Sequence, residues 1–501
     1  MREKDYEAPP AQMSDHRTLL SGTALNIVGL AAGVAAAFGV QVLMGRQLGR
    51  SGLGLVTVAV QVAFVAAAGS RFGMDLSAVR DVAIARGAGQ LRTMRSLVDR
   101  CTGVAFAVSV AAAAVIAGVA AAAGSGEIAI AAASIPLAAA ANVYLGATRG
   151  LKQMAPTLWV FWIGQPLAWI ALAVVAFAAG GGVDSAVWSY DLSWLLGLVA
   201  ARVLWRRASD GFGDERARPE QVQGALRFGL PRAPSALLAQ ALFWADLWVV
   251  GAYVSDAQVG TYAAVGRISQ VLLLFLTSVN LLFSPFAADL HARGLRDQLD
   301  GLFKSATRWA LAATIPVVII LWVAAADVLA AFGPRYAGGE DALRILLAGQ
   351  LINVATGSVA FVLIMVGRTG LDLLDNAIAV AVLVALAAPL SSAHGIEGAA
   401  VASAVAIAGV NLVRLAQVSR VVGIQPYTGD YLRLLIPAAA CLVAAVAVHA
   451  VTSGSAWYIS LLATGAAAGA AYLLLLPAGL PPGEREAIYR STRRITNRGP
   501  R

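Results

Sequence analysis

Two charged residues stand alone inside long apolar stretches of this sequence. Asp246 lies in an apolar run that ends near Val254, and Arg267 lies in the run that follows it. A polar turn, Ser255-Asp-Ala-Gln258, separates the two runs, and each charge is about ten residues from its centre. An antiparallel helical hairpin would therefore place both charges at a similar depth, roughly 15 Å from the turn.

Ionisable groups within apolar helices need partners, and two interpretations of this pair are open. In the first, Asp246 and Arg267 form an ion pair that only holds two helices together. In the second, Arg267 binds an anionic substrate, while Asp246 holds it in place or takes a coupling proton. The positions that align with them in the first half of the chain, Val40 and Gln61, are uncharged. A purely structural feature of a repeat would not require this asymmetry.

Other polar residues lie within apolar segments or at their ends. Arg46 is expected at the outer end of the first segment and Arg71 at the inner end of the second, where anchoring at the membrane surface is the simpler explanation. Amides within the segments either form hydrogen bonds between helices or line a wet cavity that binds sugar hydroxyls. The predicted substrate-binding set is Arg267, Asp246, Arg46, Arg71, Asn280, Gln350 and Asn353.

The composition indicates a membrane protein. Of the 501 residues, 59% are apolar and 13% are charged, whereas soluble domains are about half apolar and a quarter charged. The first apolar run, 19–44, is longer than the core of a signal peptide and is typical of a membrane span. We predict fourteen spans, at 19–44, 53–70, 98–123, 128–148, 156–179, 185–205, 227–253, 258–287, 306–326, 342–366, 373–390, 396–418, 431–452 and 456–477.

Arginine and lysine residues divide unevenly between the two sides of this arrangement. Of the 37, 32 fall on the side of the two termini, four fall on the other side, and Arg267 lies within a span. Basic loops face the cytoplasm, and shifting a single span would exchange the sides of every later loop. The sequence therefore predicts that both termini are cytoplasmic.

The two halves of the chain resemble each other at equivalent turns. The turn with Gly54 parallels the turn with Gly260, and Thr148–Leu151 parallels Arg368–Leu371. Equal orientation of these turns implies parallel repeats, with a site between them. We predict an all-α polytopic membrane protein of about 14 transmembrane helices, in two pseudo-symmetric six-helix lobes plus two C-terminal helices. The predicted divisions are a tail at 1–18, an N-lobe at 19–206, a linker at 207–226, a C-lobe at 227–420, two spans at 421–478 and a basic tail at 479–501.

No constellation of catalytic residues is evident. The four histidines are scattered, and the sequence has no GxxxxGK phosphate loop, GxSxG elbow or Asp-x-Asp pair. We expect a transporter rather than an enzyme, with no cofactor and no nucleic-acid partner. The predicted outside loops are short, which disfavours a membrane polymerase or ligase. Most tryptophans between 159 and 205 are expected at the membrane interface or facing lipid.

Several stretches resemble the oligosaccharide (polysaccharide) flippase family, whose superfamily includes lipid II flippases and multidrug and toxin extruders. They are Asp246–Gly251, Val259–Tyr262, Arg267, Phe283-Ser-Pro285, Gly73–Arg80, Phe332–Tyr336, Gly367–Gly370 and Gly395–Ala402. The resemblance implies that polyprenyl-pyrophosphate-linked oligosaccharide units are flipped outward across the bacterial inner membrane by alternating access, for surface polysaccharide biosynthesis.

The same resemblance implies a lipid-linked glycan and membrane lipids as partners, and it leaves polysaccharide-assembly proteins open as further ones. It also leaves open whether H⁺, Na⁺ or the membrane potential drives the movement. An ion-coupled multidrug exporter of the same superfamily is the alternative function. Such an exporter would need a cavity rich in carboxylates for its cations, and the spans here hold few acidic residues.

Overall fold

The structure is a computed structural model that describes residues 13–230, 233–277, 294–366 and 368–481, and positions 279, 283, 290 and 485. Side chains are described from residue 32 onward, except at 233–236, 238–239, 241–243, 365 and 369. Throughout this part of the chain, the regular elements are helices and no strand is present.

The first half of the chain holds ten helical elements. They are α1 (Met13–Ser70), α2 (Met74–Gly87), α3 (Met94–Ala122), α4 (Gly126–Ala131), α5 (Ser134–Gly150), α6 (Ala155–Thr157), η1 (Leu158–Gly164), α7 (Gln165–Ala178), α8 (Val183–Ala208) and α9 (Pro219–Gly229). The second half, in its described ranges, begins with α10 (Ala233–Gly251), α11 (Asp256–Ser269), η3 (Gln270–Leu272), α13 (Arg296–Val323) and α14 (Ala325–Ala330). It continues with η4 (Pro334–Gly339), α15 (Glu340–Thr356), α16 (Val359–Met365), α17 (Thr369–Val421), η5 (Gly429–Leu434), α18 (Leu435–Thr452) and α19 (Trp457–Gly479).

Ten helices in the described ranges are long and apolar enough to cross a membrane. Two of them, α1 and α17, contain a break in the backbone. The breaks are at Gly49, with φ of 69°, and at His394-Gly395, where Gly395 has φ of 58°. Glycine adopts such angles readily because it has no Cβ. The all-helical membrane fold is confirmed, while the count of fourteen spans and the predicted division points stay predictions.

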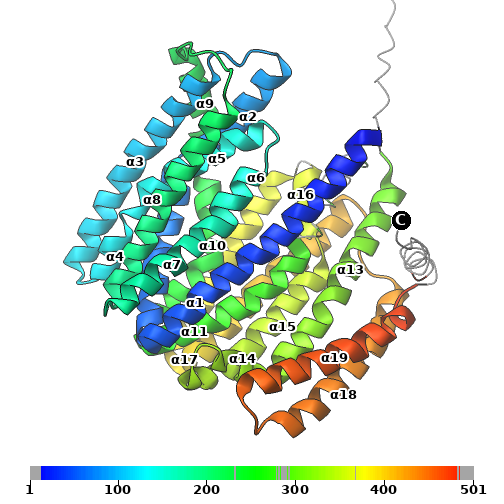
Figure 1. Cartoon of the computed structure of the whole chain (residues 1–501). Coiled ribbons are helices and arrows are strands. Elements are labelled where there is room, and N and C mark those ends of the chain that lie inside the picture. Colours follow the sequence, from blue (N-terminus) through cyan, green and yellow to red (C-terminus); the bar gives the residue numbers. More distant parts are fainter. Residues whose placement is uncertain are drawn as a thin grey trace, which may run out of the picture.

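The helices form two groups that meet along α1 (Figure 1). In the first group α5 packs on α2, α3 and α8, and in the second α17 packs on α10, α15 and α16. Helix α1 contacts both groups, because it packs on α5, α7 and α8 and also on α10 and α11. Helices α18 and α19 pack on each other and on α13 at the edge of the second group.

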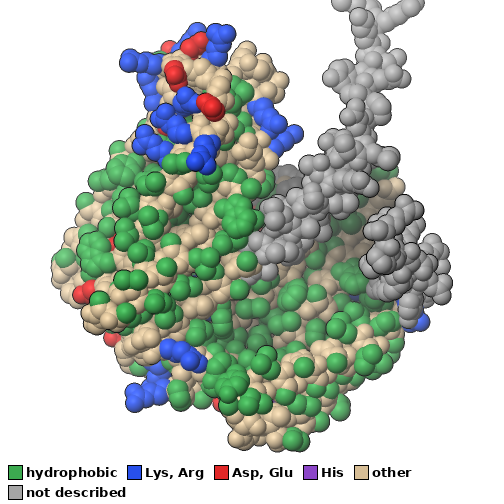
Figure 2. Space-filling view, viewed as in Figure 1, with side chains coloured by type: hydrophobic (Ala, Val, Ile, Leu, Met, Phe, Trp, Pro, Cys, Tyr) green, Lys and Arg blue, Asp and Glu red, His purple; other side chains and the backbone are tan. Residues whose placement is uncertain are grey.

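Charged side chains gather at the ends of the molecule. Figure 2 shows Lys, Arg, Asp and Glu concentrated over the end where α2 and α9 lie, above a broad band of mostly apolar surface. A belt of apolar side chains between two polar ends is the surface that a bilayer requires. The end with α2 and α9 is the one that the sequence predicts to be cytoplasmic.

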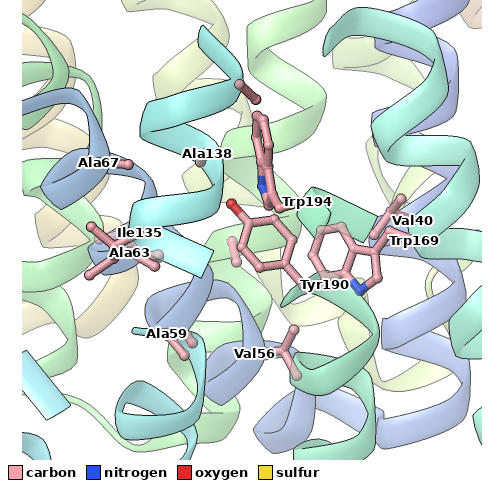
Figure 3. Packing of buried hydrophobic residues seen from close by; sticks show 14 of the residues in the cluster. Val40, Val56, Ala59, Ala63, Ala67, Ile135, Ala138, Trp169, Tyr190 and Trp194 are labelled. Atoms are coloured by element: carbon pink, nitrogen blue, oxygen red, sulfur yellow. The ribbon is translucent and has the colours of Figure 1, made fainter. Parts of the chain in front are cut away.

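Aromatic side chains fill the core of the first group. Trp169, Tyr190 and Trp194 lie close together near Val40 and Val56 of α1 (Figure 3). The ring centroids of Trp169 and Tyr190 are 4.8 Å apart. The expected interfacial or lipid-facing position holds for Trp159, Trp162 and Trp188, which are exposed, and is wrong for Trp169, Trp194 and Trp205, which are buried. The face of the helix on which each tryptophan lies determines whether it is buried or exposed. The presence of several tryptophans in this stretch does not reveal that face.

Candidate functional site

A small cavity of about 30 Å³ lies between the two groups of helices. Space of this size holds about two water molecules. Its walls come from both halves of the chain, as the repeat predicts. They are Gln41, Thr57 and Gln61 of α1, Trp244, Asp246 and Leu247 of α10, Tyr262, Ala263, Gly266 and Arg267 of α11, and Gln270 of η3.

The carboxylate of Asp246 joins three elements of the second group. Its Oδ2 atom accepts hydrogen bonds from the Tyr262 hydroxyl at 3.0 Å and from the Ser403 hydroxyl, on α17, at 2.9 Å. Its Oδ1 atom accepts a bond from the backbone N–H of Leu247 at 2.8 Å. Hydrogen bonds to an ionised group are the stronger kind. This network therefore fixes Asp246 in the cavity wall.

Arg267 lies in the same cavity but has no acidic partner among the described residues. Its guanidinium lies 5.6 Å from the centroid of the Trp244 ring, and its Nη1 atom donates to Oε1 of Gln270 at 3.5 Å. Among the described residues, the hydrogen bond to Gln270 engages a single one of the five guanidinium N–H donors. A cation held in this way is suited to an anion that enters the cavity.

The direct ion pair between Asp246 and Arg267 is not formed, although the structure describes both side chains. The sequence argument assumed a tight hairpin of two adjacent helices. Instead α10 packs mainly on α17, and α11 packs mainly on α1. Across the turn Asp246 meets Tyr262, and Arg267 lies five residues further along α11, about 7.5 Å at 1.5 Å per residue. Asp246 therefore does not hold Arg267 directly.

The α1 side of the cavity contributes neutral amides. Gln61 is 6% exposed, and its Oε1 atom has no hydrogen-bond partner among the described residues. Gln41 accepts a bond from the Thr57 hydroxyl at 3.3 Å. A buried carbonyl oxygen without a donor is costly, because it has lost water and gained nothing. A hydroxyl group of a ligand would satisfy Gln61 at this point.

Glycines bring the two halves together on the predicted outer side of the cavity. A Cβ atom added at Gly260 of α11 would lie 1.8 Å from the carbonyl oxygen of Arg50, and one added at Gly54 of α1 would lie 2.5 Å from that of Asp256. Gly54 and Gly260 are the residues that the repeat aligns, and each lies close to the other's backbone. Mutual contact of equivalent residues is what a two-fold axis between repeats produces.

A second close contact lies on the opposite side of the cavity. A Cβ at Gly73 would be 2.5 Å from the carbonyl oxygen of Gly229, and one at Gly69 would be 3.0 Å from Cδ1 of Leu237. Gly73 has φ of 65°, which only glycine adopts without strain. The cavity therefore lies between two regions of close backbone packing, and both must part for a large substrate to pass through.

Arg46 and Arg71 lie outside the cavity wall. The Nε atom of Arg46 donates to the carbonyl oxygen of Ala331 at 2.7 Å, and the guanidinium lies 5.7 Å from the centroid of the Trp457 ring. Arg71 lies 3.7 Å from the carboxylate of Asp75, one turn further along the chain. Arg46 thus ties α1 to the second group and to α19. The substrate-binding role predicted for these two residues stays a prediction.

The predicted amides of the second half form a chain of hydrogen bonds between helices. Asn411 of α17 donates to Oδ1 of Asn353 at 3.0 Å, and Asn353 donates to Oε1 of Gln350 at 3.0 Å. The structure therefore joins Gln350 and Asn353 to each other rather than to Arg267. Asn280, the remaining predicted residue, lies outside the described residues.

Sequence reasoning missed the residues that complete the site around Asp246 and Arg267. Ser403 lies far along the chain on α17, and no spacing rule connects it with α10. Gln270 lies three residues after Arg267, so a helical-face argument that included i+3 neighbours would have found it beside Arg267. Trp244 lies only two residues before Asp246, and its contact with Arg267 crosses from α10 to α11. Tyr262 was noted only as part of a motif, although its hydroxyl needs a partner when buried.

A family model described as "Polysaccharide biosynthesis protein" matches residues 19–286, more than half of the chain. The chain belongs to this family. The matched range holds both cavity charges and ends after α11. A search among curated proteins returned no match.

Solved structures agree with this assignment at the level of the fold. The lipid II flippase MurJ in an inward closed conformation has a TM-score of 0.67 at 13% identity, covering 90% of this chain and 98% of its own. A multidrug resistance MATE family transporter of the MOP superfamily, inward-facing, has a TM-score of 0.64 at 15% identity, covering 79% and 94%. An outward-facing MATE family transporter of the MOP superfamily has a TM-score of 0.57 at 15% identity, covering 80% of this chain and 95% of its own. At such low identity the likeness shows a shared fold, that of the MOP flippases and transporters.

Proposed function

We propose that the protein moves polyprenyl-pyrophosphate-linked oligosaccharide units from the inner to the outer leaflet of the bacterial plasma membrane by alternating access. The observation that carries the proposal is Arg267, a cation without an acidic partner among the described residues, in a cavity between the two halves. Membership of the polysaccharide biosynthesis family supports the substrate class. Both termini are proposed to be cytoplasmic, on the strength of the charge distribution.

The chemistry of such a substrate matches the two sides of the cavity. Its pyrophosphate is an anion that Arg267 can bind with charge-assisted hydrogen bonds. Its sugar hydroxyls can form hydrogen bonds with the amides of Gln41 and Gln61. The Oε1 atom of Gln61 otherwise lacks a donor among the described residues. A hydroxyl without a partner in hydrocarbon costs several kcal/mol, so a polar path is needed for the sugars. The polyprenyl chain can remain in the bilayer throughout.

Movement must open the structure, because the cavity of about 30 Å³ is far smaller than ligand sites of roughly 300–1,000 Å³. The contact at Gly54 and Gly260 is proposed to part when the site faces outward, and the contact at Gly69 and Gly73 when it faces inward. Rocking of two repeats about a fixed site is the usual form of alternating access. The membrane potential favours outward movement of an anion by about 2.3 kcal/mol per charge per 100 mV.

Asp246 is proposed as the residue that couples an ion to this movement. It is the carboxylate of the cavity wall, and it bonds α10, α11 and α17 together. Protonation would weaken the bonds that it accepts as an anion. Replacement of Asp246 by Asn tests whether this carboxylate takes part in the coupling.

The MATE-like fold makes a cationic drug exporter the second candidate. A cation entering this cavity would meet the charge of Arg267, and Asp246 already accepts three hydrogen bonds. The charge in the site thus favours an anionic substrate. Loss of the protein is expected to stop a surface polysaccharide while its lipid-linked unit accumulates in the inner leaflet. A loss that changed only resistance to cationic drugs would favour the exporter.

Arg267 and Arg414 provide a matched test of the site. Arg267→Ala removes the cation from the cavity without leaving a carboxylate unpaired, so transport should be lost while protein abundance stays near normal. Arg414, on α17, is 7% exposed and donates to Asp372 at 2.8 Å. Its removal leaves an uncompensated charge, which costs about 3–5 kcal/mol, so Arg414→Ala should lower abundance.

The measurement is the amount of lipid-linked oligosaccharide in each leaflet together with the amount of protein in the membrane. Normal transport by Arg267→Ala would overturn the role proposed for Arg267. Adding Asp246→Ala to Arg267→Ala should restore nothing, because the two side chains are not paired. Recovery of transport in that double variant would show that the two residues act only as a structural pair.

A further inference from the structure

A second and larger hollow, of about 570 Å³, lies between α3 and the linker helix α9. Four residues of α3 line one wall and four residues of α9 line the other, each set spaced i, i+3, i+4 and i+7, which is one face of a helix. They are Arg100, Gly103, Val104 and Ala107, opposite Pro219, Val222, Gln223 and Leu226. Gly103 and Ala107 leave the groove open because they carry little or no side chain.

The groove combines two polar side chains with a lining that is otherwise apolar or small. Arg100 and Gln223 supply the polar groups, and Val104, Val222 and Leu226 supply apolar wall. Arg100 is exposed and makes no hydrogen bond or ion pair with the described residues. Its neighbours at the same end of the molecule are paired, Arg95 with Asp214 at 2.9 Å and Arg206 with Asp99 at 3.0 Å. Arg100 is therefore available to an anion from outside the chain.

The position of the groove relative to the membrane indicates which class of anion can reach Arg100. Helix α3 is a candidate membrane span with mean hydropathy 2.4, and only 22% of its most apolar window is buried, so most of it faces lipid. Arg100 lies six residues after the start of α3, about 9 Å along the helix. The groove thus joins the charged end of the molecule to its apolar belt. An anionic lipid has the same arrangement, because its charged headgroup leads into an apolar chain.

We propose that this groove binds an anionic glycerophospholipid of the inner leaflet, with its phosphate on Arg100 and an acyl chain along Gly103 and Ala107. The proposal rests on the membrane orientation given above and is independent of the substrate that is transported. The anionic cytoplasmic leaflet supplies such a lipid next to a basic residue. Because α9 leads from the first group of helices into α10, a lipid in the groove ties the linker to the first group.

The test uses the full-length protein in detergent, titrated with phosphatidylglycerol and followed by native mass spectrometry. Arg100→Gln removes the cation, and Ala107→Phe fills the groove while keeping the cation. Arg207→Gln is the matched control, since Arg207 is an exposed arginine in the last turn of α8 that does not line the groove. Loss of one basic contact near the membrane is expected to weaken binding of one lipid about fivefold.

The expected result is weaker retention in Arg100→Gln and Ala107→Phe, and unchanged retention in Arg207→Gln. Phosphatidylcholine with the same chains should bind the wild type less tightly, and inorganic phosphate should not displace the lipid. Equal losses in Arg100→Gln and Arg207→Gln, equal binding of the two lipids, or displacement by phosphate alone would each overturn the proposal. Gel filtration checks the fold, and Gly103→Leu replaces Ala107→Phe if that variant is not folded. No transport is measured, so failure here leaves the proposed substrate untouched.

Discussion

A single methyl group at Gly260 should shift the protein toward its outward-open form. The added Cβ of Gly260→Ala would lie 1.8 Å from the carbonyl oxygen of Arg50, whereas ordinary contacts begin at 3.4 Å, so α1 and α11 must separate by about 1.6 Å. Overpacking of this kind costs about 1–3 kcal/mol, and only the conformation with this contact carries the cost. The equilibrium should therefore move about 5- to 150-fold away from the outer-closed form.

The assay places a cysteine at Gln61, in the cavity, in a protein whose Cys101 and Cys441 are replaced by Ala. A maleimide that does not cross the membrane then reports opening toward the outside, and Gly260→Ala should label faster. Gly266→Ala is the matched control, because it lies on the same helix and its Cβ would meet nothing within 4 Å. Equal labelling in the two variants, with both present at normal abundance, would refute the argument that this contact closes the outer side.

Two further predictions concern coupling and topology. Asp246→Asn keeps an acceptor oxygen toward Tyr262 and Ser403 but cannot ionise, so transport should lose its dependence on an ion gradient while the protein remains abundant. Transport that responds to the gradient as before, measured in vesicles, would remove Asp246 from the coupling mechanism. A reporter fused after Arg501 that is active only in the cytoplasm should be active, and its inactivity would contradict the proposed orientation.

Much of the fold was predictable because a bilayer restricts what a chain can do. Backbone groups in hydrocarbon must bond within a helix, so apolar length identifies the helices in advance. The resemblance between the turns at Gly54 and Gly260 also predicted that the two halves meet near a common site. The cavity lined by Gln61 and Arg267 lies at that position. Local pattern and repeat thus predicted the all-helical membrane fold and a cavity between the halves, while the fourteen spans and the division points stay predictions.

The pairing of side chains was not predictable from the same information. Helices that are consecutive in sequence, such as α10 and α11, need not be each other's main packing partners within a large bundle. Here α17 packs on α10 and supplies Ser403 to Asp246, beside Tyr262 of α11. Asn353 illustrates the same limit, because its partner Asn411 lies 58 residues further along the chain. Depth along the membrane follows from counting residues, but rotation of a helix about its axis depends on packing against all its neighbours.

The asymmetry between the two halves explains how the proposed site can select an anion and still release it. Gln61 and Arg267 each lie seven residues after an aligned glycine, and both line the cavity, so the repeat places an amide opposite a cation. One hydrogen bond to a charged group contributes about 1.5–3 kcal/mol, enough to select an anion. A second arginine in place of Gln61 would add a comparable amount for a pyrophosphate and slow its release. A transporter must release what it binds, and one cation facing one neutral amide satisfies both demands.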